Sequence, residues 1–125
     1  MNIPANLKYS KTDEWFDSSN GAMGLTDYAQ SQLSDIVFVE IVVSAGDSIS
    51  AGAAMASVES VKAAAESYAT VSGKVIAVNE VLSGNPEILN SDPYGKGWMV
   101  KVESGDSSAL MDAAAYTKYC EERSH

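Results

Sequence analysis

The chain has 125 residues, of which 46% are hydrophobic and 20% are charged. This balance is typical of one globular domain, spanning residues 1–125, and excludes a largely disordered chain. Seventeen acidic residues against eight basic ones give a formal net charge of −9, which argues against nucleic acid and anionic membranes as partners.

The cysteine count and the apolar pattern bear on the compartment. Cys120 is the only cysteine, so no internal disulfide can form, which favours a reducing environment. No apolar run approaches the roughly 20 residues of a membrane span. Met1-Asn2-Ile3-Pro4 lacks the pattern of a secretory or transit segment. We therefore expect a cytoplasmic protein, or one of the mitochondrial matrix if the chain is a mature organellar form. A monomer is expected because nothing in the sequence indicates a large apolar surface patch.

Residues 9–43 predict a hairpin, a short helix and a strand. Asn20-Gly21 is a strong hairpin signal, with a first strand before it and a second strand ending near Leu25. Thr26 is expected to cap a helix in which Asp27 suits the first turn. Ile36–Val43 is almost continuously apolar and rich in β-branched residues, which predicts a buried strand.

Residues 46–79 predict a meander of short strands between glycine turns. A bend is expected at Val61-Lys62, and the strands are Ser48–Ser50, Met55–Ser60, Ala63–Tyr68 and Lys74–Asn79. Such spacing is typical of a β-sandwich or barrel. A glycine turn before a strand occurs on both sides of the bend, in Gly46-Asp47-Ser48-Ile49 and in Ser72-Gly73-Lys74-Val75, which hints at two similar halves.

The last third predicts one strand and two helical segments. Asn85 is expected to cap a helical turn that Pro86 opens, and Trp98–Val102 to form a strand. Ser107 or Ser108 is expected to cap a C-terminal helical segment, with helix over Ala113–Glu122 and a frayed polar tail over 121–125.

The residues offer little catalytic equipment. His125 is the only histidine and the last residue, so neither a histidine metal site nor a serine–histidine dyad is expected. Cys120 fits a small helix residue, and Gly95-Lys96-Gly97 lacks the context of a phosphate loop. We therefore expect a protein that is not an enzyme and holds no metal.

Lys62 is the residue most indicative of function. It lies at a bend between two strands, next to Val61 and before the small residues Ala63, Ala64 and Ala65. Small neighbours leave room for a modifying enzyme, so a chain without catalytic residues is expected to carry a reactive group on this lysine. The alternative is an ordinary solvated lysine on an unmodified binding module.

The segment around this lysine reads Val58-Glu59-Ser60-Val61-Lys62-Ala63, and further motifs follow one another between Leu7 and Glu122. They are Leu7-Lys8-Tyr9-Ser10-Lys11, Glu14-Trp15, Gly24-Leu25-Thr26-Asp27-Tyr28-Ala29-Gln30, Ile36-Val37-Phe38-Val39-Glu40, Val71-Ser72-Gly73, Val78-Asn79, Asn85-Pro86-Glu87, Asp92-Pro93-Tyr94-Gly95 and Gly97-Trp98. The ordered set resembles the glycine cleavage system H-protein family. Within it, Lys62 with Glu59, Ser60, Val61 and Ala63 resembles the family's lipoylation motif.

The resemblance implies a mainly β fold, a lipoyl-domain-like flattened barrel or sandwich of two small antiparallel sheets with short helices and a C-terminal helix. It implies a non-catalytic carrier with lipoate attached to Lys62. The arm would accept an aminomethyl group from a pyridoxal-phosphate glycine decarboxylase and deliver it to a tetrahydrofolate-dependent aminomethyltransferase. Dihydrolipoamide dehydrogenase would then reoxidise it, and lipoylating enzymes would be further partners.

The resemblance also implies a cleft that shelters the loaded arm, with Glu14 and Glu66 as the carboxylates that hold its amine. For both acids the alternative is plain surface charge. Four positions depart from the family pattern. They are Asp13 in place of a common histidine, Ala65-Glu66 in place of serine-aspartate, Thr70 in place of proline and Ser34 in place of glycine.

Three other carrier roles are open at this point. A lipoyl domain of a 2-oxoacid dehydrogenase is usually part of a long chain with a linker and an acyltransferase domain, and its lysine context differs. A biotin carrier would have methionines beside the lysine, where this chain has Val61 and Ala63. An H-like protein that relays lipoyl groups to other acceptors would use the same lysine.

Overall fold

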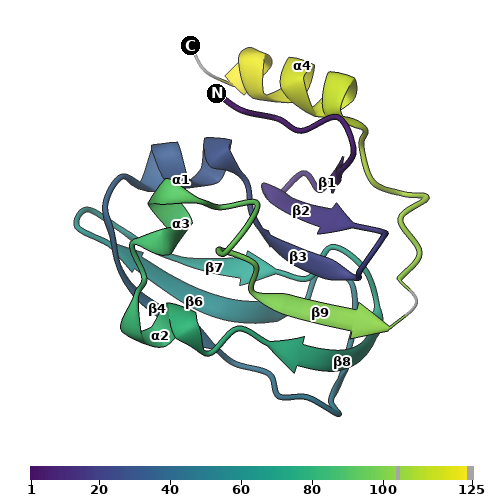
Figure 1. Ribbon diagram of the computed structural model, residues 1–125. Coiled ribbons are helices and arrows are strands. Elements are labelled where there is room, and N and C mark those ends of the chain that lie inside the picture. The colour runs from purple at the N-terminus through teal and green to yellow at the C-terminus, as the bar shows by residue number, and fades with distance from the viewer. Residues whose placement is uncertain (104, 124–125) are drawn as a thin grey trace.

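The computed structural model describes residues 1–103 and 105–123, and Figure 1 shows its two antiparallel sheets. The larger sheet has the order β1-β2-β3-β9-β8-β5 and the smaller has the order β4-β6-β7. The strands of the larger sheet are β1 (Lys8–Tyr9), β2 (Glu14–Asp17), β3 (Ala22–Leu25), β9 (Val100–Glu103), β8 (Gly73–Val78) and β5 (Ser48–Ile49); those of the smaller are β4 (Ile36–Ile41), β6 (Ala54–Ser60) and β7 (Ala64–Tyr68). The predicted mainly β class is confirmed as a pair of sheets that do not close into a barrel.

The main hydrophobic core takes side chains from both sheets. Phe16, Met23 and Val100 from the larger sheet belong to the same buried cluster as Val39 and Val58 from the smaller one. A second cluster lies at the end of the molecule where α4 (Ala113–Arg123) packs near β1, and the N-terminal segment lies on that side too in Figure 1. The rings of Tyr9 and Tyr116 stack there with centroids 4.7 Å apart.

The predicted hairpin at Asn20-Gly21 is confirmed, since β2 and β3 pair directly on either side of it. Gly21 has φ of 77°, and a Cβ at this position would lie 2.1 Å from the carbonyl oxygen of Val102. Only glycine therefore fits both the turn and the neighbouring β9 strand. The following helix α1 (Asp27–Leu33) is capped as expected, because Thr26 Oγ1 accepts a hydrogen bond of 3.1 Å from the Ala29 N–H.

The prediction that Ile36–Val43 is a buried strand is wrong for half of its side chains. Ile36 and Val39 are buried, but Val37 is 56% exposed and Phe38 is 43% exposed. The register with β6 shifts between Ile36 and Phe38, so two consecutive side chains point away from the core. β4 is also the edge strand of a sheet that buries only one face, which an apolar run alone does not reveal.

The helical segments near the C-terminus differ from the predicted caps. Asn85 does not cap the turn after it; it ends α2 (Val81–Gly84), a helix the sequence did not indicate, and its Nδ2 donates to the Val81 carbonyl. The next helix, α3 (Ile88–Ser91), has Glu87 at its N-cap position. Asp112, rather than Ser107 or Ser108, caps α4 by accepting from the Ala115 N–H at 2.8 Å.

The predicted fraying of residues 121–125 is wrong up to Arg123. The helix α4 continues to Arg123 because that side chain is held by tertiary contacts, whereas Ser124 and His125 lie outside the described residues. The predicted helix over Ala113–Glu122 is confirmed, with Cys120 buried in it. Within the part of the chain that the structure describes, no helix has the length and apolarity to cross a bilayer.

The predicted strands of the middle region are confirmed, and the last strand begins at Val100 rather than at Trp98. The two similar stretches lie side by side, since β5 pairs with β8 through Ser48↔Lys74 and Ile49↔Gly73. The remaining element of interest is the hairpin between β6 and β7, which contains Lys62.

Candidate functional site

Lys62 lies in the bend that joins β6 to β7. These strands pair up to Glu59↔Ala64, and the bend follows immediately, with Val61, Lys62 and Ala63 all exposed. Figure 1 shows the hairpin projecting from the end of the three-stranded sheet, well separated from α4. Among the described residues, no hydrogen bond or ion pair engages the Lys62 amine. The amine is therefore presented to solvent at a turn that other molecules can reach.

Ser60 gives this bend a defined shape. Its hydroxyl oxygen accepts the backbone N–H of Ala63 at 3.1 Å and that of Lys62 at 3.3 Å. The Ser60 backbone N–H donates to the Ala63 carbonyl at 2.8 Å. Local bonds of this kind between a serine and the following backbone stabilise tight turns. A further bond of 3.0 Å, from the Val61 N–H to the Asp35 carbonyl, ties the hairpin to the segment between α1 and β4.

A groove of about 550 Å³ begins beside the bend of this hairpin and runs over the three-stranded sheet. Glu59 and Ala64, the last paired residues before the bend, form one end of its lining. Phe38 of β4 contributes an apolar side, and Glu66 and Tyr68 of β7 complete the lining. The groove is thus next to the lysine, partly apolar and lined by two carboxylates, and Glu66 is exposed in it.

Glu14 lies in a different environment from Glu66. Its side chain is fully buried, so the alternative of plain surface charge is wrong for this residue. One carboxylate oxygen accepts hydrogen bonds from the hydroxyls of Ser10, at 2.7 Å, and Thr12. The other accepts the backbone N–H of Tyr68 at 3.0 Å. Because Tyr68 lines the groove, Glu14 is bonded to the backbone of a groove residue without lining the groove itself.

Burial raises the pKa of the Glu14 carboxyl from an ordinary 4.5 to about 7, although the bonds from Thr12, Tyr68 and Ser10 act in the opposite direction. The negative charge of Asp13 raises it further. Among the described residues no cation pairs with this carboxylate. A buried acid with donors but no counter-cation is a candidate for a functional group, because its charge is costly until a cation arrives.

The structure keeps the predicted site residues in two places. Lys62, its motif residues and Glu66 lie on the β6–β7 hairpin, where Glu59 and Glu66 line the groove, whereas Glu14 bonds to the Tyr68 N–H and makes no described bond to Glu66. The roles of Ser10 and Thr12 were not indicated by the sequence reading. The signal available was two hydroxyl side chains at alternate positions before an acid, a pattern too common to single out.

Comparison with known proteins decides the family. The model of the family described as glycine cleavage H-protein matches residues 7–123. The chain belongs to the glycine cleavage H-protein family. A glycine cleavage system H protein of Deinococcus deserti is 51% identical over 117 residues, covering 93% of this chain and 96% of that one. Another, from Carboxydothermus hydrogenoformans, is 49% identical over 125 residues, covering 96% and 95%.

A solved structure agrees with the family assignment. The crystal structure of a glycine cleavage system H protein from Mycobacterium marinum superposes with a TM-score of 0.84 at 30% identity, covering 98% of this chain and all of that chain. The resemblance seen in the sequence is therefore confirmed over nearly the whole length. The family model, these two relatives and this structure are all of H-proteins.

Proposed function

We propose that Lys62 is the lysine that carries the lipoyl group in this H-protein, within the recognition motif formed by Glu59, Ser60, Val61 and Ala63. The observation that supports this most directly is the exposed Lys62 amine on a bend that the Ser60 hydroxyl fixes. A lysine that must fit a modifying enzyme and later swing between partners needs both exposure and a firm base. The two alanines after the motif, Ala64 and Ala65, leave space around it.

The chain is a non-catalytic lipoyl carrier of the glycine cleavage system, as membership of its family implies. When bound, lipoate supplies a disulfide that can be reduced as it takes up an aminomethyl group. The protein's own residues present the attachment point, orient it and offer a groove beside it. Attachment through a tether raises the local concentration of the carried group at each partner, provided that the arm reaches.

We further propose the individual partners: a pyridoxal-phosphate glycine decarboxylase, a tetrahydrofolate-dependent aminomethyltransferase, dihydrolipoamide dehydrogenase and the lipoylating enzymes. The hairpin of Lys62 is the element that all of them would approach. The net charge of −9 favours partner surfaces that carry basic patches. Residues 1–125 would act as one unit and as a monomer, and the bacterial relatives favour the cytoplasm as its compartment.

Glu14 and Glu66 are proposed to shelter the loaded arm. Glu66 faces the groove and is available to a protonated amine at once. The buried Glu14 would be reached only if Tyr68 or the turn before Glu14 moves, but a cation that arrived there would meet an unpaired buried carboxylate. Glu14→Gln is therefore expected to speed the loss of the carried group to solvent, with exposed Glu103→Gln on the other sheet as the control.

Intact mass of the protein from lipoate-replete cells tests the attachment site. Parent and Lys74→Arg, an exposed lysine on β8, should both gain the lipoyl mass, and Lys62→Arg should not. A lipoyl increment that persists in Lys62→Arg would place the group elsewhere.

Exchange of carbon dioxide with the glycine carboxyl group, catalysed by a glycine decarboxylase, then separates glycine cleavage from lipoyl relay. Lipoylated parent that supports no more exchange than Lys62→Arg would favour the relay.

A further inference from the structure

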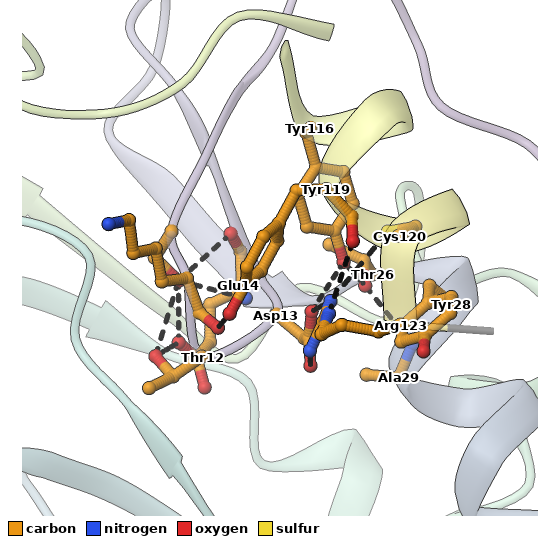
Figure 2. A network of polar contacts seen from close by, with 12 residues as sticks. Thr12, Asp13, Glu14, Thr26, Tyr28, Ala29, Tyr116, Tyr119, Cys120 and Arg123 are labelled. Carbon is orange, nitrogen blue, oxygen red and sulfur yellow. Dashed lines mark hydrogen bonds and ion pairs between the residues drawn. The ribbon is translucent and has the colours of Figure 1, made fainter. Parts of the chain in front are cut away.

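The last turn of α4 is anchored on the turn that precedes Glu14, and Figure 2 shows the contacts. The Arg123 guanidinium binds Asp13 through both carboxylate oxygens, at 2.6 Å from Nη2 and 3.2 Å from Nη1. The same guanidinium lies 3.9 Å from the ring centre of Tyr119 and 4.7 Å from that of Tyr28. Arg123 is thus held between two aromatic rings while it forms a bidentate ion pair.

Asp13 has an unusual backbone that these contacts maintain. Its φ is 73°, a conformation that costs a non-glycine residue of the order of 1 kcal/mol or more. The Asp13 carboxylate also accepts the Tyr116 hydroxyl at 2.9 Å, and that hydroxyl is 2.7 Å from Thr26 Oγ1. The conformation of Asp13 is therefore set by α4 and by the N-terminal cap of α1, in addition to its own turn.

The same turn supplies the donors of Glu14. Residues 10–13 are closed by the bond from the Asp13 N–H to the Ser10 carbonyl, and within them Ser10 and Thr12 place their hydroxyls on the Glu14 carboxylate. A second contact from α4 reaches this turn, because the Tyr119 hydroxyl donates to the Lys11 carbonyl at 2.9 Å. The geometry of the Glu14 site therefore depends on a helix about 100 residues further along the chain.

We infer that Arg123 and Tyr119 are positioning residues for Glu14: they hold the turn 10–13 so that the carboxylate keeps its hydroxyl donors and can pair with the amine of the carried group. The consequence for the arm rests on the proposed role of Glu14. The ion pair of Arg123 with Asp13 links this turn to α4.

Two electrostatic effects act in the same direction when Arg123 is removed. A loosened turn withdraws the hydroxyls that favour the ionised form of Glu14. The loss of the guanidinium also leaves the negative charge of Asp13, the adjacent residue, without its partner. From β7, Glu14 faces the neutral N–H of Tyr68, which does not compensate. Both effects disfavour a second negative charge on Glu14.

The titration of Glu14 in the full, unlipoylated chain tests the inference. Carboxyl ¹³C signals are followed from pH 5 to 9, and the Glu14 signal is assigned by its loss in Glu14→Gln. Arg123→Met should raise the Glu14 midpoint by about half a pH unit to one pH unit. Lys118→Met, which removes an exposed cation from the same helix, should leave it unchanged. A midpoint in folded Arg123→Met equal to that of Lys118→Met would overturn the inference.

Tyr119→Phe gives a milder test, because it removes only the hydroxyl that binds Lys11 and retains the ring beside Arg123. A smaller rise of the Glu14 midpoint is expected, and it decides the matter if Arg123→Met does not fold; an unchanged midpoint would then overturn the inference.

In the loaded protein at pH 7, a midpoint raised from about 7 by half a unit to one unit lowers the ionised fraction about twofold to fivefold. Loss of the carried group should accelerate by the same factor. A raised midpoint with an unchanged rate of loss would overturn the role of Glu14 in sheltering the arm, but the proposal that Lys62 is the attachment site would still stand.

Discussion

The buried Glu14 should make this protein lose stability as the pH rises through neutrality. In the unfolded chain its carboxyl releases a proton with the ordinary pKa of 4.5, and in the folded chain burial raises this pKa to about 7. The folded state therefore binds the proton more tightly between these values, and the free energy of unfolding falls as the pH rises across this window. One pKa unit corresponds to about 1.4 kcal/mol, so the fall attributable to Glu14 is about 3 kcal/mol.

Glu14→Gln isolates this contribution. A glutamine has the same shape, stays neutral, and can accept the Tyr68 N–H with its oxygen while its amide donates to the hydroxyl oxygens of Ser10 and Thr12. Urea unfolding of parent and variant at pH 5, 6, 7 and 8 gives the difference in free energy of unfolding at each pH. We expect that difference to shift by about 2.5 kcal/mol in favour of the variant between pH 5 and pH 8, because part of the full effect lies below pH 5.

Glu66→Gln is the matched control, because it makes the same chemical change at an exposed position. Its free energy of unfolding should fall with pH as that of the parent does, because the buried Glu14 is retained. Parent and Glu14→Gln curves that stay parallel from pH 5 to pH 8 would refute the reasoning, and would mean that the donors around Glu14 offset its burial.

Three further substitutions each test one local feature of the structure. Ser60→Ala removes the hydroxyl that accepts the Lys62 and Ala63 N–H groups. Destabilising the bend by about 1 kcal/mol should slow lipoylation about fivefold in a ligase assay. An unchanged rate would show that the bend forms without this hydroxyl. Ser34→Gly relieves a residue with φ of 66° and should raise the free energy of unfolding by about 1 kcal/mol in urea titration; a loss would contradict this. Ser67→Ala removes a buried hydroxyl that lacks a described partner and should raise the melting temperature or leave it equal, whereas a decrease of several degrees would reveal a partner.

Local sequence predicted those elements whose signals are short-range. Asn20-Gly21 marked a hairpin because the turn itself requires a positive φ, and Thr26 marked a helix start because its hydroxyl bonds within its own turn. Predictions failed where a distant strand or helix decided the outcome. The bulge at Val37 depends on the register with β6, and Arg123 remains helical because of Asp13.

The same distinction, between features set by local sequence and features set by distant segments, applies to the candidate site. Local sequence alone indicated the family, through ordered motifs along the chain, and singled out Lys62 as the candidate lipoyl lysine, through its immediate neighbours. The folded structure was needed to show that Glu14 is buried rather than exposed, that its donors are Ser10, Thr12 and the Tyr68 backbone, and that α4 holds the turn supplying two of them. Burial and charge pairing depend on segments that lie far apart in the chain and meet only on folding, and no local pattern encodes them.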